Sequence, residues 1–170
     1  MNPIIYFEQK VKVANTHSER IEEAFECLQS VRPITLSFMK TITFDQRNCL
    51  EMALHRFAKL QNLLGDKIFP LLMIFMNKDN KKQSYIDQLN ILEKMELLPS
   101  RLEWIEMRKL QNKIAHNYPC DPMTTVQETN DALDAAQKLV NYWHTLLPKI
   151  KKLLICIKKS IASINVSSTQ

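Results

Sequence analysis

The chain has 170 residues, the size of one domain with a substantial core. Gly65 is the only glycine, and because tight hairpins and dinucleotide-binding loops depend on glycine, the composition argues against β-rich and Rossmann-like folds. Five lysines and no acid lie from Leu146 to the end, so the rest of the chain is formally neutral, and a uniformly basic nucleic-acid-binding domain is not indicated. Leu, Lys, Glu, Gln, Met and Ala are plentiful, which predicts an all-α fold.

The first expected elements lie between the N-terminus and Pro33. Residues 1–15 are expected to form an irregular arm or a short strand. Thr16 and Glu19 have the spacing of a capping box, which predicts the start of a helix that ends at Pro33. Residues 34–42 combine apolar side chains with Thr and Ser and predict a connection that is at least partly buried.

A long helical pattern follows, from Thr43 to about Met76. Its apolar residues keep helical spacing. Gly65 and Pro70 lie inside this pattern, so the sequence predicts either a kink or two helices joined by a bend. The wholly polar segment 77–82 predicts a loop.

Two further helices are expected before residue 119. Ser84 is expected to begin the first of them, which is broken at Pro99. Ser100 opens a second capping box and begins a helix that reaches Asn117. The segment 119–122 contains two prolines and predicts a turn.

The last predicted helix begins at Thr124 or Thr125. Pro148 either closes it or bends it into a basic C-terminal helix or tail, residues 149–170, whose polar end is expected to fray. Together these elements predict a single domain, residues 1–170, built as an up-down antiparallel bundle of four to five helices.

The cysteines and histidines do not cluster as zinc ligands would. With no Cys-x-x-Cys pair, the cysteines are expected to be buried or idle thiols in a reducing cytosol. Residues 4–7 are too short for a signal-peptide core, and the apolar run 68–76 is too short to span a bilayer. The sequence therefore predicts a cytoplasmic protein without a metal or cofactor. The dispersed residues are Cys27, Cys49, Cys120 and Cys156, and His17, His55, His116 and His144.

A polar row on the helix after Ser100 is the most informative pattern in the chain. Arg108, Asn112 and His116 recur at every fourth residue, so they share one face of a helix. An apolar row on roughly the opposite side is expected to pack into the core, and Pro119 ends the helix just beyond the histidine. That apolar row consists of Met107, Leu110, Ile114 and Tyr118.

The segment from Arg108 to Pro119, RKLQNKIAHNYP, resembles the motif helix of the HEPN superfamily, which includes the HepT-like toxins of HEPN/MNT toxin–antitoxin systems. That motif is an Arg, usually followed by a polar residue such as Asn, then a His four to six residues after the Arg, with a Tyr two residues later in many toxins. Asn112, His116 and Tyr118 match, and Gln111 occupies the Arg position. A looser likeness covers residues 57–70 and 86–99.

The resemblance implies a homodimer whose Arg and His side chains meet at a cleft between the subunits and cut RNA without metal. His116 would transfer protons near neutral pH, with Asn112 on the same face. Because Gln111 has no charge, Arg108 would have to supply the guanidinium across the dimer. The resemblance also implies an MNT-type nucleotidyltransferase as antitoxin partner, and Tyr118 as the residue that such a partner adenylylates.

Further cations could extend a binding surface. Arg101 falls in the same row as Arg108. Lys151, Lys152 and Lys158 lie in the basic C-terminal segment, which is either a solvated amphipathic helix or a contact for RNA, for an acidic partner or for anionic lipid. Lipid is the least favoured of these because nothing else in the sequence indicates a membrane.

Two functional hypotheses follow from the resemblance. The first is a metal-independent endoribonuclease of a toxin–antitoxin or nucleotidyltransferase-associated system, weakened by Gln111. The second is a non-catalytic binding module that docks a nucleotidyltransferase partner or a nucleotide. A helical protein unrelated to this superfamily is the third alternative, because the motif is short.

Overall fold

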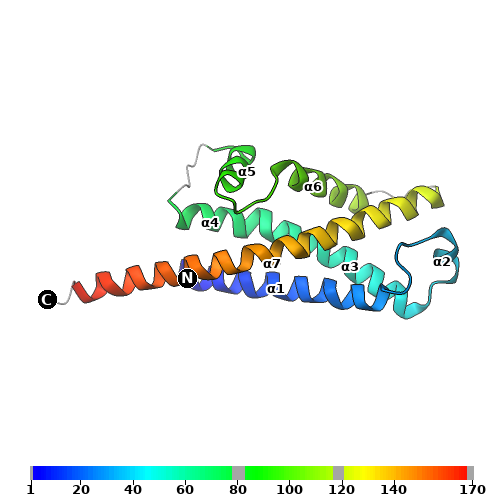
Figure 1. The fold of residues 1–170 in the computed structure, drawn as a ribbon, viewed down its shortest axis with the longest axis horizontal. Coiled ribbons are helices and arrows are strands. Elements are labelled where there is room, and N and C mark those ends of the chain that lie inside the picture. The colour runs from blue at the N-terminus through cyan, green and yellow to red at the C-terminus, as the bar shows by residue number, and fades with distance from the viewer. Residues whose placement is uncertain (1, 78–82, 117–120, 168–170) are drawn as a thin grey trace.

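The computed structural model describes residues 2–77, 83–116 and 121–167, and Figure 1 shows their arrangement. Within these ranges the chain is helical and has no strand, which confirms the predicted all-α fold. The sequence pattern does not predict the short helix α2 or the π-helical segment η1. The elements are α1 (Pro3–Leu28), α2 (Leu36–Thr41), α3 (Phe44–Leu63), η1 (Leu64–Ile68), α4 (Phe69–Phe75), α5 (Tyr85–Lys94), α6 (Arg101–His116) and α7 (Pro122–Ser167).

Helices α1, α3 and α7 pack against one another and surround the main core. In Figure 1, α3 and α7 run in the same direction and α1 runs opposite to both, while α6 runs antiparallel to α7. The expected up-down order therefore describes some neighbouring pairs, and α3 with α7 is an exception. The largest fully buried side chains are Trp104, Trp143, Phe7, Phe57 and Phe69.

The N-terminal segment is helical from Pro3, so the expected arm or strand over 1–15 is wrong. Asn2 caps α1, since its Oδ1 accepts a hydrogen bond from the backbone N of Ile4 at 2.9 Å, and asparagine followed by proline is a favourable helix start. Thr16 lies inside α1, where its hydroxyl donates to the carbonyl one turn earlier. The buried positions keep helical spacing through both halves: Ile4, Phe7, Val11, Ala14, Ser18 and Ile21.

Three predicted helix starts are confirmed. Thr43 and Gln46 form a reciprocal capping box at α3, and Ser84 and Asp87 form another at α5. At α6 the hydroxyl of Ser100 accepts a hydrogen bond from the backbone N three residues later, at 3.2 Å. Each cap satisfies amide groups that the first helical turn leaves without an intrahelical acceptor.

Gly65 and Pro70 mark a wide turn, and the helix path continues through them. The chain passes from α3 through the π-helical segment η1 directly into α4, and Pro70 lies in the first turn of α4, where its missing N–H is tolerated. Segments of π-helix are rare and often lie at functional sites. At the predicted interruption the structure thus has an extra-wide helical turn.

Helix α7 begins earlier and extends further than the sequence predicts. It starts at Pro122, and Oδ2 of Asp121 accepts from the backbone N of Thr124 at 2.8 Å. Pro148 lies inside α7, which continues to Ser167, so the predicted basic C-terminal segment is part of one long helix. Buried apolar side chains on both sides of the proline hold this helix on the core: Leu146, Ile150 and Leu154.

Two of the predicted free thiols are bonded to each other. Cys27 near the end of α1 and Cys49 in the first turns of α3 form a disulfide, with their Cα atoms 6.4 Å apart. The expectation of idle thiols is therefore wrong for this pair, because the fold brings two residues that are distant in sequence within bonding reach. Cys156 is an exposed free thiol, and Cys120 lies outside the described residues.

None of the helices in the described ranges has the length and apolar character needed to cross a membrane. The most apolar segment, which includes α4, is instead buried against the core through Phe69, Leu72 and Met73.

Gln61 on α3 is a buried polar residue for which replacement by methionine should stabilise the fold. Its side chain is 1% exposed, and neither amide atom has a hydrogen-bond partner among the residues that the structure describes. Because a buried unpaired amide costs free energy, Gln61→Met is expected to raise the free energy of unfolding by about 1 kcal/mol or more in urea titrations. The exposed α1 residue Gln9 provides the matched control Gln9→Met, and equal effects of both substitutions would contradict the prediction.

Candidate functional site

A groove lies between η1, α5 and α6, and we refer to it as the Arg108 groove. It encloses about 620 Å³. Two members of the predicted polar row, Arg108 and Asn112, line it, so the sequence pattern predicted the α6 side of this groove. The residues that determine its chemistry are Gly65, Asp66, Tyr85, Gln88, Arg108 and Asn112.

The guanidinium of Arg108 is held in a defined position. Its Nη1 donates to Oη of Tyr85 at 3.1 Å, and its guanidinium carbon lies 5.1 Å from the centre of the same ring. Nη2 lies 3.9 Å from Oδ1 of Asp66. The Arg108 side chain is 37% exposed and that of Asp66 is 55% exposed, so this ion pair is weak and an incoming anion could replace the carboxylate. Arg108 thus presents a fixed cation at the groove wall.

Tyr85 connects the groove to the core. Its hydroxyl accepts a second hydrogen bond from Nε1 of Trp104 at 2.7 Å. Trp104 is fully buried, and its ring centre lies 4.7 Å from that of Phe69 on α4. The capping box of Ser84 fixes Tyr85 at the first position of α5. A phenol oxygen that accepts two hydrogen bonds still has its own proton to donate.

The single glycine of the chain lies where these side chains converge. A β-carbon on Gly65 would lie 3.2 Å from Oη of Tyr85, 3.3 Å from Nη1 of Arg108 and 3.4 Å from Cζ2 of Trp104. All three distances are shorter than about 3.5 Å, the lower end of the optimal separation between non-bonded carbon atoms. Because Gly65 has no side chain, Arg108 can approach the backbone of η1 closely.

Substitution of Gly65 by leucine should displace Arg108. The added side chain must enter the space that the guanidinium and the Tyr85 hydroxyl occupy, so Gly65→Leu is expected to lower the free energy of unfolding by about 1–3 kcal/mol. Gly65→Ala is the smaller substitution and serves as the control. Its single methyl group makes a milder contact, which the gain in helix propensity of about 1 kcal/mol offsets, so little change in stability is expected. Urea unfolding followed by tryptophan fluorescence checks both, and a leucine variant as stable as the alanine variant would contradict this account.

Gln111, which occupies the arginine position of the motif, lies apart from the Arg108 groove. Its side chain is 8% exposed, and within the described part of the chain its Oε1 has no hydrogen-bond partner. It lines a separate cavity of about 200 Å³ with Phe57 of α3 and Ile114. The helix thus turns Gln111 inward and Arg108 towards α5, and the two residues are not brought together. His116 is the last residue of α6, but its side chain and the whole of Tyr118 lie outside the described residues.

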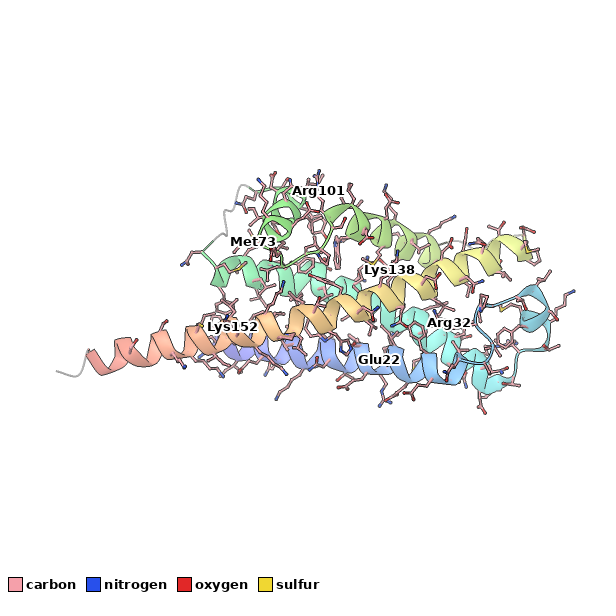
Figure 2. The ribbon with its side chains drawn as sticks, in the orientation of Figure 1. Glu22, Arg32, Met73, Arg101, Lys138 and Lys152 are labelled. Atoms are coloured by element: carbon pink, nitrogen blue, oxygen red, sulfur yellow. A yellow bond between two sulfur atoms is a disulfide. The ribbon has the colours of Figure 1, made fainter. Side chains whose placement is uncertain are left out.

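The other predicted cations are engaged elsewhere or exposed. Arg101, at the start of α6 (Figure 2), has its backbone N bonded to Oε1 of Glu93 at 2.8 Å and its Nε 3.7 Å from Oε2 of the same residue. Lys158 forms an ion pair of 2.6 Å with Glu8 of α1. Lys151 and Lys152 are exposed on α7. None of these four lines the Arg108 groove.

The groove can bind an anion that carries an apolar group. Arg108 supplies a charge-assisted hydrogen-bond donor, and the amides of Gln88 and Asn112 supply neutral donors and acceptors. Apolar side chains complete the wall: Pro70, Ile86 and Ile105. Among the described residues no group of three His, Cys, Asp or Glu side chains is placed to hold a metal ion.

Sequence reasoning missed Tyr85, Asp66 and the role of Gly65. The isolated glycine within a helical pattern was a usable signal, because such a glycine often marks a close approach. Compared with known proteins, the chain matches no family model, no curated protein and no solved structure.

Proposed function

We propose that the protein is a HEPN-like, non-catalytic binding module whose Arg108 groove takes the phosphate of a nucleotide. The observation that supports this is the position of Arg108, held by the Tyr85 ring and hydroxyl in a groove of about 620 Å³ with an apolar wall. Guanidinium groups bind phosphate oxygens through two parallel hydrogen bonds, and the apolar wall accommodates a base or ribose.

The proposal includes the cellular context that the resemblance implies. The protein would act in the cytoplasm as a homodimer, as one component of a toxin–antitoxin or nucleotidyltransferase-associated system. Its partner would be a small nucleotidyltransferase of the MNT type, which handles the same class of ligand as the Arg108 groove.

Binding is favoured over RNA cleavage because the charge and the histidine of the motif are separated. Arg108 and His116 are eight residues apart on α6, which is about 12 Å along the helix axis. The residue at the expected arginine position, Gln111, is neutral and faces the interior. A second candidate, metal-independent cleavage of RNA, is favoured by one observation: Asn112 shares the groove with Arg108.

Calorimetric titration of the purified protein with ATP, in EDTA, tests the proposal. Arg108→Gln is expected to weaken binding about tenfold or more, because a charged donor to phosphate is lost. Arg47→Gln, on the exposed side of α3, removes the same charge away from the groove and should leave the affinity unchanged. Absence of binding to the wild type, or equal affinity of all three proteins, would refute the proposal.

RNA cleavage in EDTA separates the two candidates. The proposal expects no cleavage by the wild type, whereas cleavage that His116→Ala abolishes would establish the nuclease. Gln111→Arg tests whether the motif charge restores cleavage, provided that circular dichroism shows an intact fold, because position 111 is 8% exposed. Arg108→Gln would then show whether Arg108 had replaced the motif arginine.

A further inference from the structure

One exposed face of α7 changes from acidic to basic along its length. Its charged residues recur at steps of three or four, or at sums of such steps, which places them on the same side of the helix. The first half has two aspartates and one lysine, the second half has three lysines, and all six are exposed. The charges on this face are Asp131, Asp134, Lys138, Lys149, Lys152 and Lys159.

The acidic half borders a groove with an apolar floor, which we refer to as the α6–α7 groove. It encloses about 570 Å³, and its floor includes Leu102, which is 65% exposed, and Met107. An adjoining hollow of about 320 Å³ shares Met107 and Lys138 and extends to Thr145. From Asp131 to Thr145 the combined groove follows α7 for about 21 Å, the length of a four-turn helix.

The α6–α7 groove is negative at its rim. Glu103 and Glu106 of α6 face Asp131 and Asp134 of α7, and among the described residues Lys138 is the one cation that lines the groove. Two acids already have ion pairs within the chain, Glu106 with Lys109 at 2.8 Å and Asp134 with Arg32 at 3.4 Å. Because the carboxylates of both pairs are exposed, at 69% for Glu106 and 75% for Asp134, the pairs contribute little and the acids can take new partners.

At the end of the basic half, no helix of the described ranges lies beside this face (Figure 1). In Figure 1 the C-terminal part of α7 extends beyond α1 and the other helices, and Figure 2 shows Lys138 and Lys152 along this helix. Ile155 is 54% exposed, between Lys152 and Lys159. Lys149 donates to the carbonyl of Glu96. The projecting segment is thus a basic helix with an exposed apolar side chain.

We propose that two copies of the chain associate through this face of α7, with the two α7 helices antiparallel. Asp134 and Lys159 are equally far from the peptide bond between residues 146 and 147, and so are Lys138 and Ile155. A twofold axis near this bond would therefore place the basic half of each copy in the α6–α7 groove of the other. In each contact Asp134 of one copy would face Lys159 of the other, and both contacts cover exposed apolar side chains.

A second copy is the occupant that the observations favour. It supplies a basic, partly apolar helix for the groove and at the same time covers its own projecting segment. An unrelated basic peptide would fill the α6–α7 groove and leave the lysines of the second half without an acidic partner. The Arg108 groove lies on another face of α6, lined by Ile105, Arg108 and Asn112. The pairing rests on the homodimer of the proposed function and names its interface, whereas nucleotide binding at the Arg108 groove is measured separately by calorimetry.

Analytical ultracentrifugation of the full chain tests the pairing. The wild type should sediment as a dimer in about 0.05 M NaCl and dissociate towards about 0.5 M, since exposed charges are screened. Asp131→Lys/Asp134→Lys and Lys152→Glu/Lys159→Glu should each raise the dimer dissociation constant at least about tenfold. Lys12→Glu/Lys59→Glu, at exposed sites of α1 and α3, changes the net charge by the same amount as Lys152→Glu/Lys159→Glu. This control should leave the dimer dissociation constant unchanged.

Mixing the two charge-reversed proteins gives the decisive result. One then has lysine in both halves and the other has acid in both halves, so an equimolar mixture should form a heterodimer although each alone is monomeric. Circular dichroism establishes that both variants are folded. A monomeric wild type, a dimer that neither double substitution weakens, or a mixture that stays monomeric would overturn the proposal.

Discussion

Removal of the Cys27–Cys49 disulfide, by the double substitution Cys27→Ser/Cys49→Ser, is expected to lower the free energy of unfolding by about 3 kcal/mol. The two cysteines are 22 residues apart in sequence, and a cross-link over a loop of this length restricts the unfolded chain by roughly that amount. Urea unfolding of the oxidised wild type and of the double variant measures the difference. The loss is expected to be the same when the wild type is unfolded in reductant.

The exposed thiol of Cys156 supplies the control for this experiment. Cys156→Ser changes a cysteine of α7 that is free among the described residues, so the free energy of unfolding of this variant should stay within about 0.5 kcal/mol of the wild type. Equal stability of the oxidised wild type and the Cys27→Ser/Cys49→Ser protein would show that the cross-link does not contribute to the fold.

Tyr85→Phe is expected to destabilise the protein by about 1–3 kcal/mol, although only one oxygen atom is removed. Trp104 is fully buried, and its Nε1 would lose its acceptor, while Nη1 of Arg108 would lose one of its partners. A buried donor left without an acceptor costs its full desolvation. Thermal and urea unfolding measure the effect.

Tyr6→Phe is the matched control for Tyr85→Phe. Tyr6 is a half-buried residue of α1, and its ring lies under the ammonium group of Lys10, 4.8 Å from the ring centre. Since the substitution keeps the ring, the effect should be below about 0.5 kcal/mol. If both tyrosine variants unfold alike, the hydrogen bonds of Tyr85 do not hold the groove wall together.

The sequence predicted those parts of the fold that depend on neighbouring residues. The caps at Thr43, Ser84 and Ser100 involve side chains three residues away or fewer, so their spacing was sufficient. The start of α1 was missed although Asn2 and Pro3 are equally local. Thr16 and Glu19 offered a competing capping box, and a capping pattern within a helix is not distinguishable from a true start without the packing of the preceding residues.

The candidate site was predictable only in part, because its partners come from distant elements. Arg108 and Asn112 were identified from their spacing on one helix. Tyr85 and Asp66 reach Arg108 from α5 and η1, and no local pattern indicates such contacts. The inward position of Gln111 was also not predictable, since a single buried amide without a partner contradicts the usual distribution of polar residues.

The π-helical segment η1 has a consequence for the angular phase of the residues that follow it. In a regular α-helix each residue advances by about 100°, so one extra residue within a turn sets all later side chains back by about that angle. A continuous projection would place Phe69 and Met73 about 120° and about 160° from Phe57, and the setback reduces these angles to about 20° and about 60°. Both residues of α4 are buried, as Phe57 of α3 is. The wide turn at residues 64–68 thus turns Phe69 and Met73 towards the core that α3 already faces.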